Sequence, residues 1–289
     1  MASDDLESYI LLVLSDANLP TGSFVASAGL ESHVAHALFY SEGPRDAMKA
    51  TLAFVRDSVG TYARSALPFA RDAQRVVMDF IAQQETEPSK AIDVLMRLDA
   101  LYESTALNHV VRRASRSQGV ALLTLYAKGF TCPPFLAAPM DGEEDTMGME
   151  SRERDERVGA LIDALKLRVR REDTYGHLPV CWGVLAGALG LSLDRGSHLH
   201  LFLHARGVLS AAIRMNALGP YAAQQLLLHG VRPIVDEEAA RAAHLTSGID
   251  LSPSGNALED DERLPASTWP LGEILAARHD LLHSRIFNS

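Results

Sequence analysis

The feature that most constrains this fold is the spacing of its apolar residues, which recur every three or four positions along most of the chain. This spacing places apolar side chains on one face of a helix. No stretch alternates apolar and polar residues long enough for a convincing strand, and the nearest one, 231–235, contains Pro233. The pattern therefore predicts an all-α protein: a single multi-helix bundle domain with an amphipathic C-terminal tail.

Two stretches lack this periodicity. Residues 137–157 carry eight acidic residues against three arginines and predict an acidic loop, and residues 246–269 predict an acidic linker. We therefore expect a body over 1–245 and a docking tail over 270–289. The expected helices span about 5–15, 24–38, 44–62, 67–84, 88–103, 104–131, 151–171, 177–191, 196–217, 219–229 and 270–285.

The charge balance limits the classes of partner. With 27 Lys and Arg against 37 Asp and Glu, the net charge of −10 disfavours binding to nucleic acid or to an anionic membrane. The longest uncharged stretch, 178–193, has 16 residues, fewer than the roughly 20 of a membrane span. The N-terminus lacks the basic segment of a signal peptide. These features predict a cytoplasmic protein with no membrane or nucleic-acid partner.

Sequence motifs of common enzymes are missing. The chain has no Gly-x-x-x-x-Gly-Lys-Ser/Thr, His-Glu-x-x-His, Gly-x-Ser-x-Gly or Gly-x-Gly-x-x-Gly run, so we expect no P-loop and no cofactor. Gly183, Gly187 and Gly190 instead predict a helix face that another backbone approaches closely.

The chain has two cysteines, Cys132 and Cys181, and both lie beside apolar residues. We therefore expect both thiols to be buried.

Histidines give a weak metal hypothesis. His200 and His204 lie one helical turn apart and share a face, as metal-binding pairs do, whereas His198 lies about 200° around the helix from His200. Without a third ligand nearby in sequence, a metal site and a polar edge of a buried helix both remain open. His177 either packs at a helix start or faces a channel.

Arginines form a basic turn in this acidic chain. Arg112, Arg113 and Arg116 either pair with acidic neighbours such as Glu103 or form a docking patch for an acidic partner.

The segment 11–31 predicts two helices joined by a tight turn. The first ends at Ser15 and Asp16, and Gly22 is expected to supply a positive φ. The tail after residue 270 carries a wide apolar face with Arg278 and Arg285 beside it, so it must dock on its own body or on a partner.

These two segments resemble the urease accessory protein UreF family, and intervening features such as Arg113, His177 and Arg214 fall in the family's order. The tail resembles the family ending from His279 to Ser289, with Asp280 where Glu is usual, His283 where an aromatic is common and Ile286 for Leu. The matching opening residues are Ser15, Asp16, Leu19, Pro20, Gly22, Phe24, Ser27, Gly29, Leu30 and Glu31.

The resemblance implies a non-enzymatic, homodimeric protein that acts with UreD (also called UreH) and the GTPase UreG to deliver nickel to apo-urease. Two alternatives remain open: a GTPase-activating module acting mainly on UreG turnover, and an all-α metal enzyme using His177, His200 and His204. The resemblance places partner binding on the tail residues Arg278, His279, Asp280, Leu282, Ser284, Arg285, Ile286 and Phe287.

Overall fold

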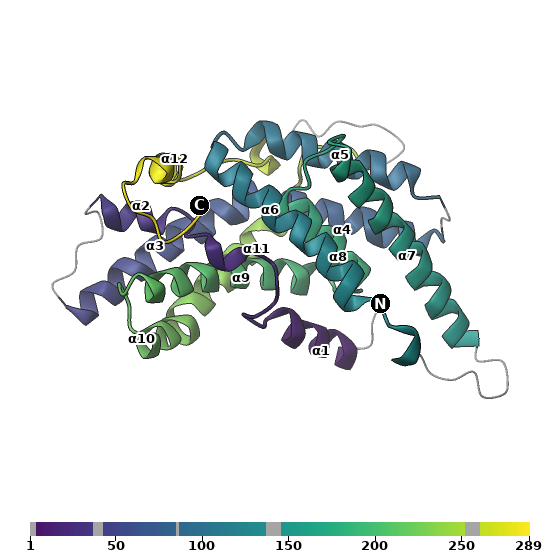
Figure 1. The fold of residues 1–289 in the computed structure, drawn as a ribbon, viewed down its shortest axis with the longest axis horizontal. Helices are drawn as coiled ribbons and strands as arrows, with labels where there is room; N and C mark the ends of the chain where they lie inside the picture. Colours follow the sequence, from purple (N-terminus) through teal and green to yellow (C-terminus); the bar gives the residue numbers. More distant parts are fainter. Residues whose placement is uncertain (1–3, 37–42, 85–86, 137–145, 252–260) are drawn as a thin grey trace.

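The computed structural model describes residues 4–36, 43–84, 87–136, 146–251 and 261–289 (Figure 1). Within these ranges the regular structure is helical and contains no strand, which confirms the all-α fold class. The helices are α1 (Asp4–Leu14), α2 (Leu30–Ala35), α3 (Pro44–Ser65), α4 (Leu67–Ala82), α5 (Ser89–Thr105), α6 (His109–Leu125), α7 (Thr146–Arg170), α8 (Leu178–Ala188), α9 (Leu193–Arg214), α10 (Pro220–Gln225), α11 (Arg232–Ala242) and α12 (Pro270–Arg278). The short helical segments are η1 (Ser23–Val25), η2 (Tyr126–Phe130), η3 (Pro134–Leu136), η4 (Leu226–Val231), η5 (Asp261–Arg263) and η6 (His279–Leu281), of which η2 and η4 are π-helical.

The centre of the domain is α8, which packs between α4 and α6 and is buried on nearly every side. Its glycines permit this contact, as the sequence predicts. A Cβ on Gly183 would lie 2.2 Å from the carbonyl oxygen of Ala70, and one on Gly187 would lie 2.8 Å from the Cβ of Val77. Since such distances exclude a side chain, the two backbones meet where only glycine fits.

The chain reaches α8 through a turn that Asp99 organises. The buried Asp99 carboxylate accepts hydrogen bonds from the backbone N–H groups of Tyr175, Gly176 and His177 at 2.7–2.8 Å, and from the Thr174 hydroxyl at 2.6 Å. These donors have no helical partner, so Asp99 satisfies them and fixes His177 directly before α8.

The structure corrects the predicted acidic loop. Helix α7 begins at Thr146, so residues 146–157 are helical, and residues 137–145 lie outside the described ranges. Arg154 donates to the Ala188 carbonyl at 3.0 Å, and Val158 is buried. The loop prediction for residues 146–157 is therefore wrong. A high density of charged residues does not exclude a helix, because a helix with one buried face tolerates a highly charged outer face.

The described parts of the predicted acidic linker lie against the body. The backbone N–H of Ser247 donates to Asp72 at 2.7 Å, and that of Thr268 donates to Thr61 at 3.1 Å. Residues 252–260 lie outside the described ranges.

Other helices also differ from the prediction. The expected helix over 24–38 is η1 followed by α2, and the expected helix over 270–285 is α12 plus the single turn η6. Helix α11 is absent from the predicted helices. Pro233, which breaks the apolar alternation over 231–235, lies in the first turn of this helix, where proline is tolerated. Among the described residues, no helix combines the length and apolar character needed to cross a membrane.

Candidate interaction site

The opening motif forms a compact turn after α1. Asp16 accepts the backbone N–H of Asn18 at 2.9 Å, and Gly22 has the positive φ of 71° that the sequence predicts. A second reversal follows, with positive φ at Ala28 (51°) and Gly29 (85°). Ser27, Gly29, Leu30 and Glu31 are buried, Ser15, Leu19 and Gly22 are half-buried, and Asp16, Pro20 and Phe24 are exposed.

The tail folds back onto this motif. The Glu31 carboxylate accepts the backbone N–H of Ile286 at 2.5 Å and that of Phe287 at 3.2 Å. Backbone hydrogen bonds continue the contact, from Asn288 to Val25 at 2.8 Å and from Ser27 to Ser289 at 2.5 Å. The opening motif and the tail therefore form one structural unit, with the C-terminus beside α2 (Figure 1).

Two arginines of the body fix the tail. Arg113 makes a two-pronged ion pair with Asp280, with both N···O distances at 2.9 Å, and donates to the Asn288 carbonyl at 3.0 Å. This geometry shows that Asp280, despite its shorter side chain, reaches the arginine. Arg214 lies over the rings of Phe24 and Phe287, at 5.4 and 4.4 Å, and donates to the Phe24 carbonyl.

The structure changes the expected partner-binding set. His279 and Phe287 are buried in this chain, at 0% and 2% exposure, so they hold the tail in place and cannot reach a partner in this conformation. Their burial follows from the docking of the tail, which sequence alone did not reveal. Of the remaining predicted residues, Arg278, Ser284, Arg285 and Ile286 are exposed, and Asp280 and Leu282 are half-buried.

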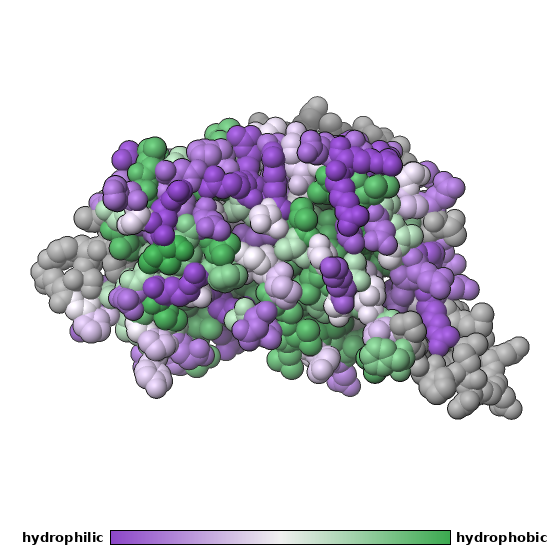
Figure 2. Space-filling view, in the orientation of Figure 1, coloured by the Kyte–Doolittle hydropathy of each residue, from purple (hydrophilic) through white to green (hydrophobic). Residues whose placement is uncertain are grey.

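Docking leaves an apolar surface facing solvent. Leu271, Ile274 and Leu281 recur along the outer side of α12 and η6, with exposures of 43%, 56% and 73%, and Ile286 is 59% exposed. Leu107 lies nearby, because the side chain of its neighbour Asn108 donates to the Glu273 carbonyl at 2.9 Å. Figure 2 shows green side chains over α12 and α2, edged by purple ones. We call these five apolar residues the tail surface.

His200 and His204 line a cavity of about 290 Å³ below the opening motif, together with Tyr62 and Ser58. His200 shares a hydrogen bond of 2.9 Å with the Tyr62 hydroxyl, and His204 shares one of 2.8 Å with Ser58. Burial lowers the pKa of His200 to about 3 and that of His204 to about 4. Both imidazoles are therefore neutral at pH 7 and form hydrogen bonds in the wall of the cavity.

The metal hypothesis gains no third ligand. Among the described residues, no three His, Cys, Asp or Glu side chains lie close enough together to hold an ion. His198 is exposed and pairs with Asp236 at 2.7 Å, whereas His177 is buried and contacts Ser115 and Glu103.

Glu103 links the basic turn to this buried histidine. The Glu103 carboxylate lies 3.0 Å from the Arg112 guanidinium, 2.5 Å from that of Arg116 and 2.7 Å from the His177 ring. Burial raises the pKa of Glu103, but the hydrogen bonds from Arg116 and His177 outweigh it and lower this pKa overall. Arg112 and Arg116 thus pair with an acidic neighbour, which was the simpler of the two interpretations.

The two cysteines differ. Cys181 is buried as expected, but Cys132 is exposed, because it follows the end of η2 and leaves the helical core.

Comparison with known proteins gives the family of the chain. The sequence pattern of the UreF family matches residues 47–230. The chain is 40% identical to "Urease accessory protein 6" of Cryptococcus neoformans, over 98% of this chain and 97% of that protein. It is also 27% identical to "Urease accessory protein F" of Arabidopsis thaliana, over 96% of this chain and 90% of the other. The family match covers most of the domain, and the relatives extend over both the opening motif and the tail, so the chain belongs to the UreF family of urease accessory proteins.

Proposed function

We propose that this protein is a non-catalytic scaffold for nickel insertion into apo-urease. In this role it binds UreD through the tail surface, recruits the GTPase UreG and acts as a cytoplasmic homodimer. Membership of a urease accessory family supports a role in urease maturation. The finer assignment depends on one observation: the tail is fixed by Glu31, Arg113 and Arg214, and it still presents large apolar side chains to solvent.

This combination is typical of a preformed docking surface. An ordered binding segment does not lose conformational entropy again when a partner arrives, so more of the contact energy appears as affinity. Full burial of a large apolar side chain contributes about 1.5–3 kcal/mol, and covering the exposed part of these side chains contributes a fraction of that. Arg278 and Arg285 are exposed beside the apolar residues and suit the polar rim of such an interface.

The test is a binding measurement between UreD and full-length protein carrying Ile274→Asp and Leu281→Asp. We expect affinity to fall at least about tenfold, since a charge replaces apolar contact at two positions. The matched control is Leu228→Asp in η4, because Leu228 has the same 56% exposure as Ile274 and lies on a different element. Unchanged UreD binding by the double variant, or an equal loss in the control, would contradict the proposal.

A further inference from the structure

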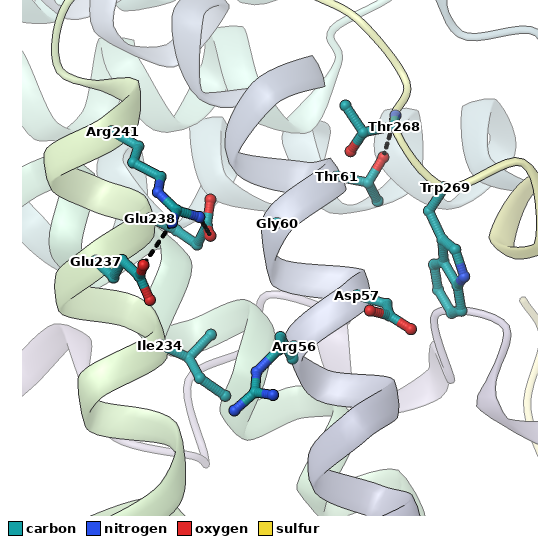
Figure 3. A pocket seen from close by; sticks show the side chains of 10 residues that line it. All are labelled: Arg56, Asp57, Gly60, Thr61, Ile234, Glu237, Glu238, Arg241, Thr268 and Trp269. Atoms are coloured by element: carbon teal, nitrogen blue, oxygen red, sulfur yellow. Dashed lines mark hydrogen bonds and ion pairs between the residues drawn. The ribbon is translucent and has the colours of Figure 1, made fainter.

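A groove of about 450 Å³ lies between α3 and α11, and its lining includes none of the residues of the tail surface (Figure 3). Helix α3 contributes Asp57 and Gly60, and α11 contributes Glu238. The Glu238 carboxyl group lies directly over Gly60, 3.8 Å from the point where a Cβ would stand. Because Gly60 has no side chain, the centre of the groove stays open between the two helices.

An aromatic wall closes one side of the groove. The Trp269 ring packs edge-on against Phe54, with centroids 5.1 Å apart. Behind it lies Gly272, where a Cβ would stand 2.2 Å from the ring, and the Thr268–Thr61 hydrogen bond ties this segment to α3. Since packing on several sides holds the indole, the wall is formed before anything binds.

One carboxylate in the groove lacks a cation. Figure 3 shows the Asp57 side chain directed toward the indole of Trp269, while the Arg56 side chain extends away from it. Asp57 is exposed and has no salt bridge with any residue that the structure describes. Its charged neighbourhood includes His33, and burial lowers the pKa of this histidine, which disfavours the imidazolium form that could pair with Asp57.

The other acidic residues of the groove are only weakly neutralised. Glu237 and Glu238 both form salt bridges with Arg241, with N···O distances of 2.5 and 2.9 Å. The Arg241 side chain is 64% exposed. Helix-surface pairs of this spacing contribute only about 0.2–0.5 kcal/mol each. A second cation can therefore approach Glu237, whose side chain is 59% exposed, with little competition.

We propose that this groove binds an arginine or lysine side chain of a partner protein, with its charged head between Asp57 and the indole of Trp269. A carboxylate beside an aromatic face attracts a cation through both its charge and the ring quadrupole. The net charge of −10 also favours a basic segment over an acidic one. That the ligand belongs to a protein, and is not a free amine, rests on the proposed scaffold function.

The first test follows binding of the tripeptide amide N-acetyl-Gly-Arg-Gly to the full-length, nitrogen-15-labelled protein. We expect saturable shifts of the Trp269 indole N–H and the Gly60 amide, with Trp182, which is buried and donates to the Gly196 carbonyl, as an internal reference. The citrulline analogue has the same shape without the charge. Its affinity should be lower by a factor of about five or more. Asp57→Asn should give the same loss.

Asp46→Asn is the matched control, because Asp46 lies on the same helix, has a side chain that is 45% exposed and pairs with Lys49 instead of lining the groove. It should leave the shifts unchanged. Absence of shifts at Trp269, or equal binding of the arginine and citrulline peptides, would overturn the site.

The second test measures urease activation in cells with Asp57→Arg, which should lower it, and with Asp46→Asn, which should not. Full activation with Asp57→Arg would overturn the docking role of the groove. This failure is distinguishable from failure of the proposed function, because the tail-surface variants test UreD binding separately and do not alter the groove.

Discussion

The Glu31 carboxylate and the backbone N–H of Ile286 meet at 2.5 Å, although 255 positions separate them in sequence. The buried Glu31 carboxylate also accepts a hydrogen bond from the backbone N–H of Phe287. The position of the tail surface thus depends on a carboxylate in the opening motif. The two family motifs are therefore parts of one structural unit.

Replacing Glu31 by Gln should loosen the tail. The amide has one accepting oxygen, and its NH₂ group would face one of two backbone N–H donors, leaving buried groups unsatisfied at a cost of about 1–3 kcal/mol. We expect faster hydrogen exchange at the amides of Ile286 and Phe287 and a lower urea midpoint. The control Asp46→Asn, which removes a carboxylate that pairs with Lys49 far from the tail in sequence, should leave this exchange unchanged. Unaltered exchange at both amides would show that Glu31 does not hold the tail.

Asp280→Asn tests the second anchor. Hydrogen bonds from Arg113 hold the pKa of Asp280 well below its usual range. The pair therefore stabilises the folded state above pH 3.8, the ordinary value, and this contribution is lost as pH falls through the lower folded-state pKa. Because His109 also contacts Asp280 at 3.2 Å and histidine is the side chain that changes charge near neutral pH, the comparison is made in a His109→Gln background. There the difference in free energy of unfolding with and without Asp280→Asn should stay constant from pH 5 to 8 and shrink below about pH 4. A difference that disappears near neutral pH would contradict this pairing.

Much of the fold follows from local sequence. Gly43 and Pro44 predict the start of α3, and Gly219 and Pro220 predict that of α10, because proline suits the first turn of a helix and not its interior.

Ala28 is an exception to this agreement between local sequence and structure. Its positive φ of 51° breaks the expected helix over 24–38, and the adjacent Ser27 is held by a hydrogen bond to Ser289. A contact from the far end of the chain overrides local helical preference there.

The composition of the candidate site was predictable, but its geometry was not. Both motifs stand out in the sequence, yet nothing in their spacing shows that Glu31 receives the tail or that His279 and Phe287 turn inward. Arg214 gave a still weaker signal, since a single arginine at a helix end is common. Its position between Phe24 and Phe287 appears only when three distant segments are assembled.

Gly183→Ala tests the closest contact in the core. The added methyl group would meet the Ala70 carbonyl oxygen at 2.2 Å, and backbone cannot move aside cheaply, so we expect a loss of about 3 kcal/mol. Gly159→Ala in α7 is the matched control. It has no neighbouring atom within 4 Å and should gain about 0.5–1 kcal/mol from higher helix propensity. Chemical denaturation of both variants measures the contrast, and a tolerated Gly183→Ala would disprove the close packing of α4 and α8.

His200 and His204 should make the protein sensitive to mild acid. Burial lowers their pKa values to about 3 and about 4, whereas the unfolded chain protonates histidine near the ordinary value of 6.5. Between pH 6.5 and 4 the unfolded state therefore binds more protons, and each histidine reduces the free energy of unfolding by about 1.4 kcal/mol per pH unit as the solution is acidified. Above about pH 6.5 both states bind no proton at these histidines, so this loss of stability is absent.

Urea denaturation at intervals from pH 7 to 4.5 measures this slope. His200→Gln and His204→Gln should each lose some stability at pH 7, because each disturbs a hydrogen bond to Tyr62 or Ser58, and each should flatten the slope by about 1.4 kcal/mol per pH unit. Ile162→Val controls for stability loss alone: it trims a fully buried side chain, should cost about 0.5–1.5 kcal/mol and should leave the slope unchanged. If the histidine variants keep the wild-type slope, these imidazoles titrate normally and the cavity is open to water.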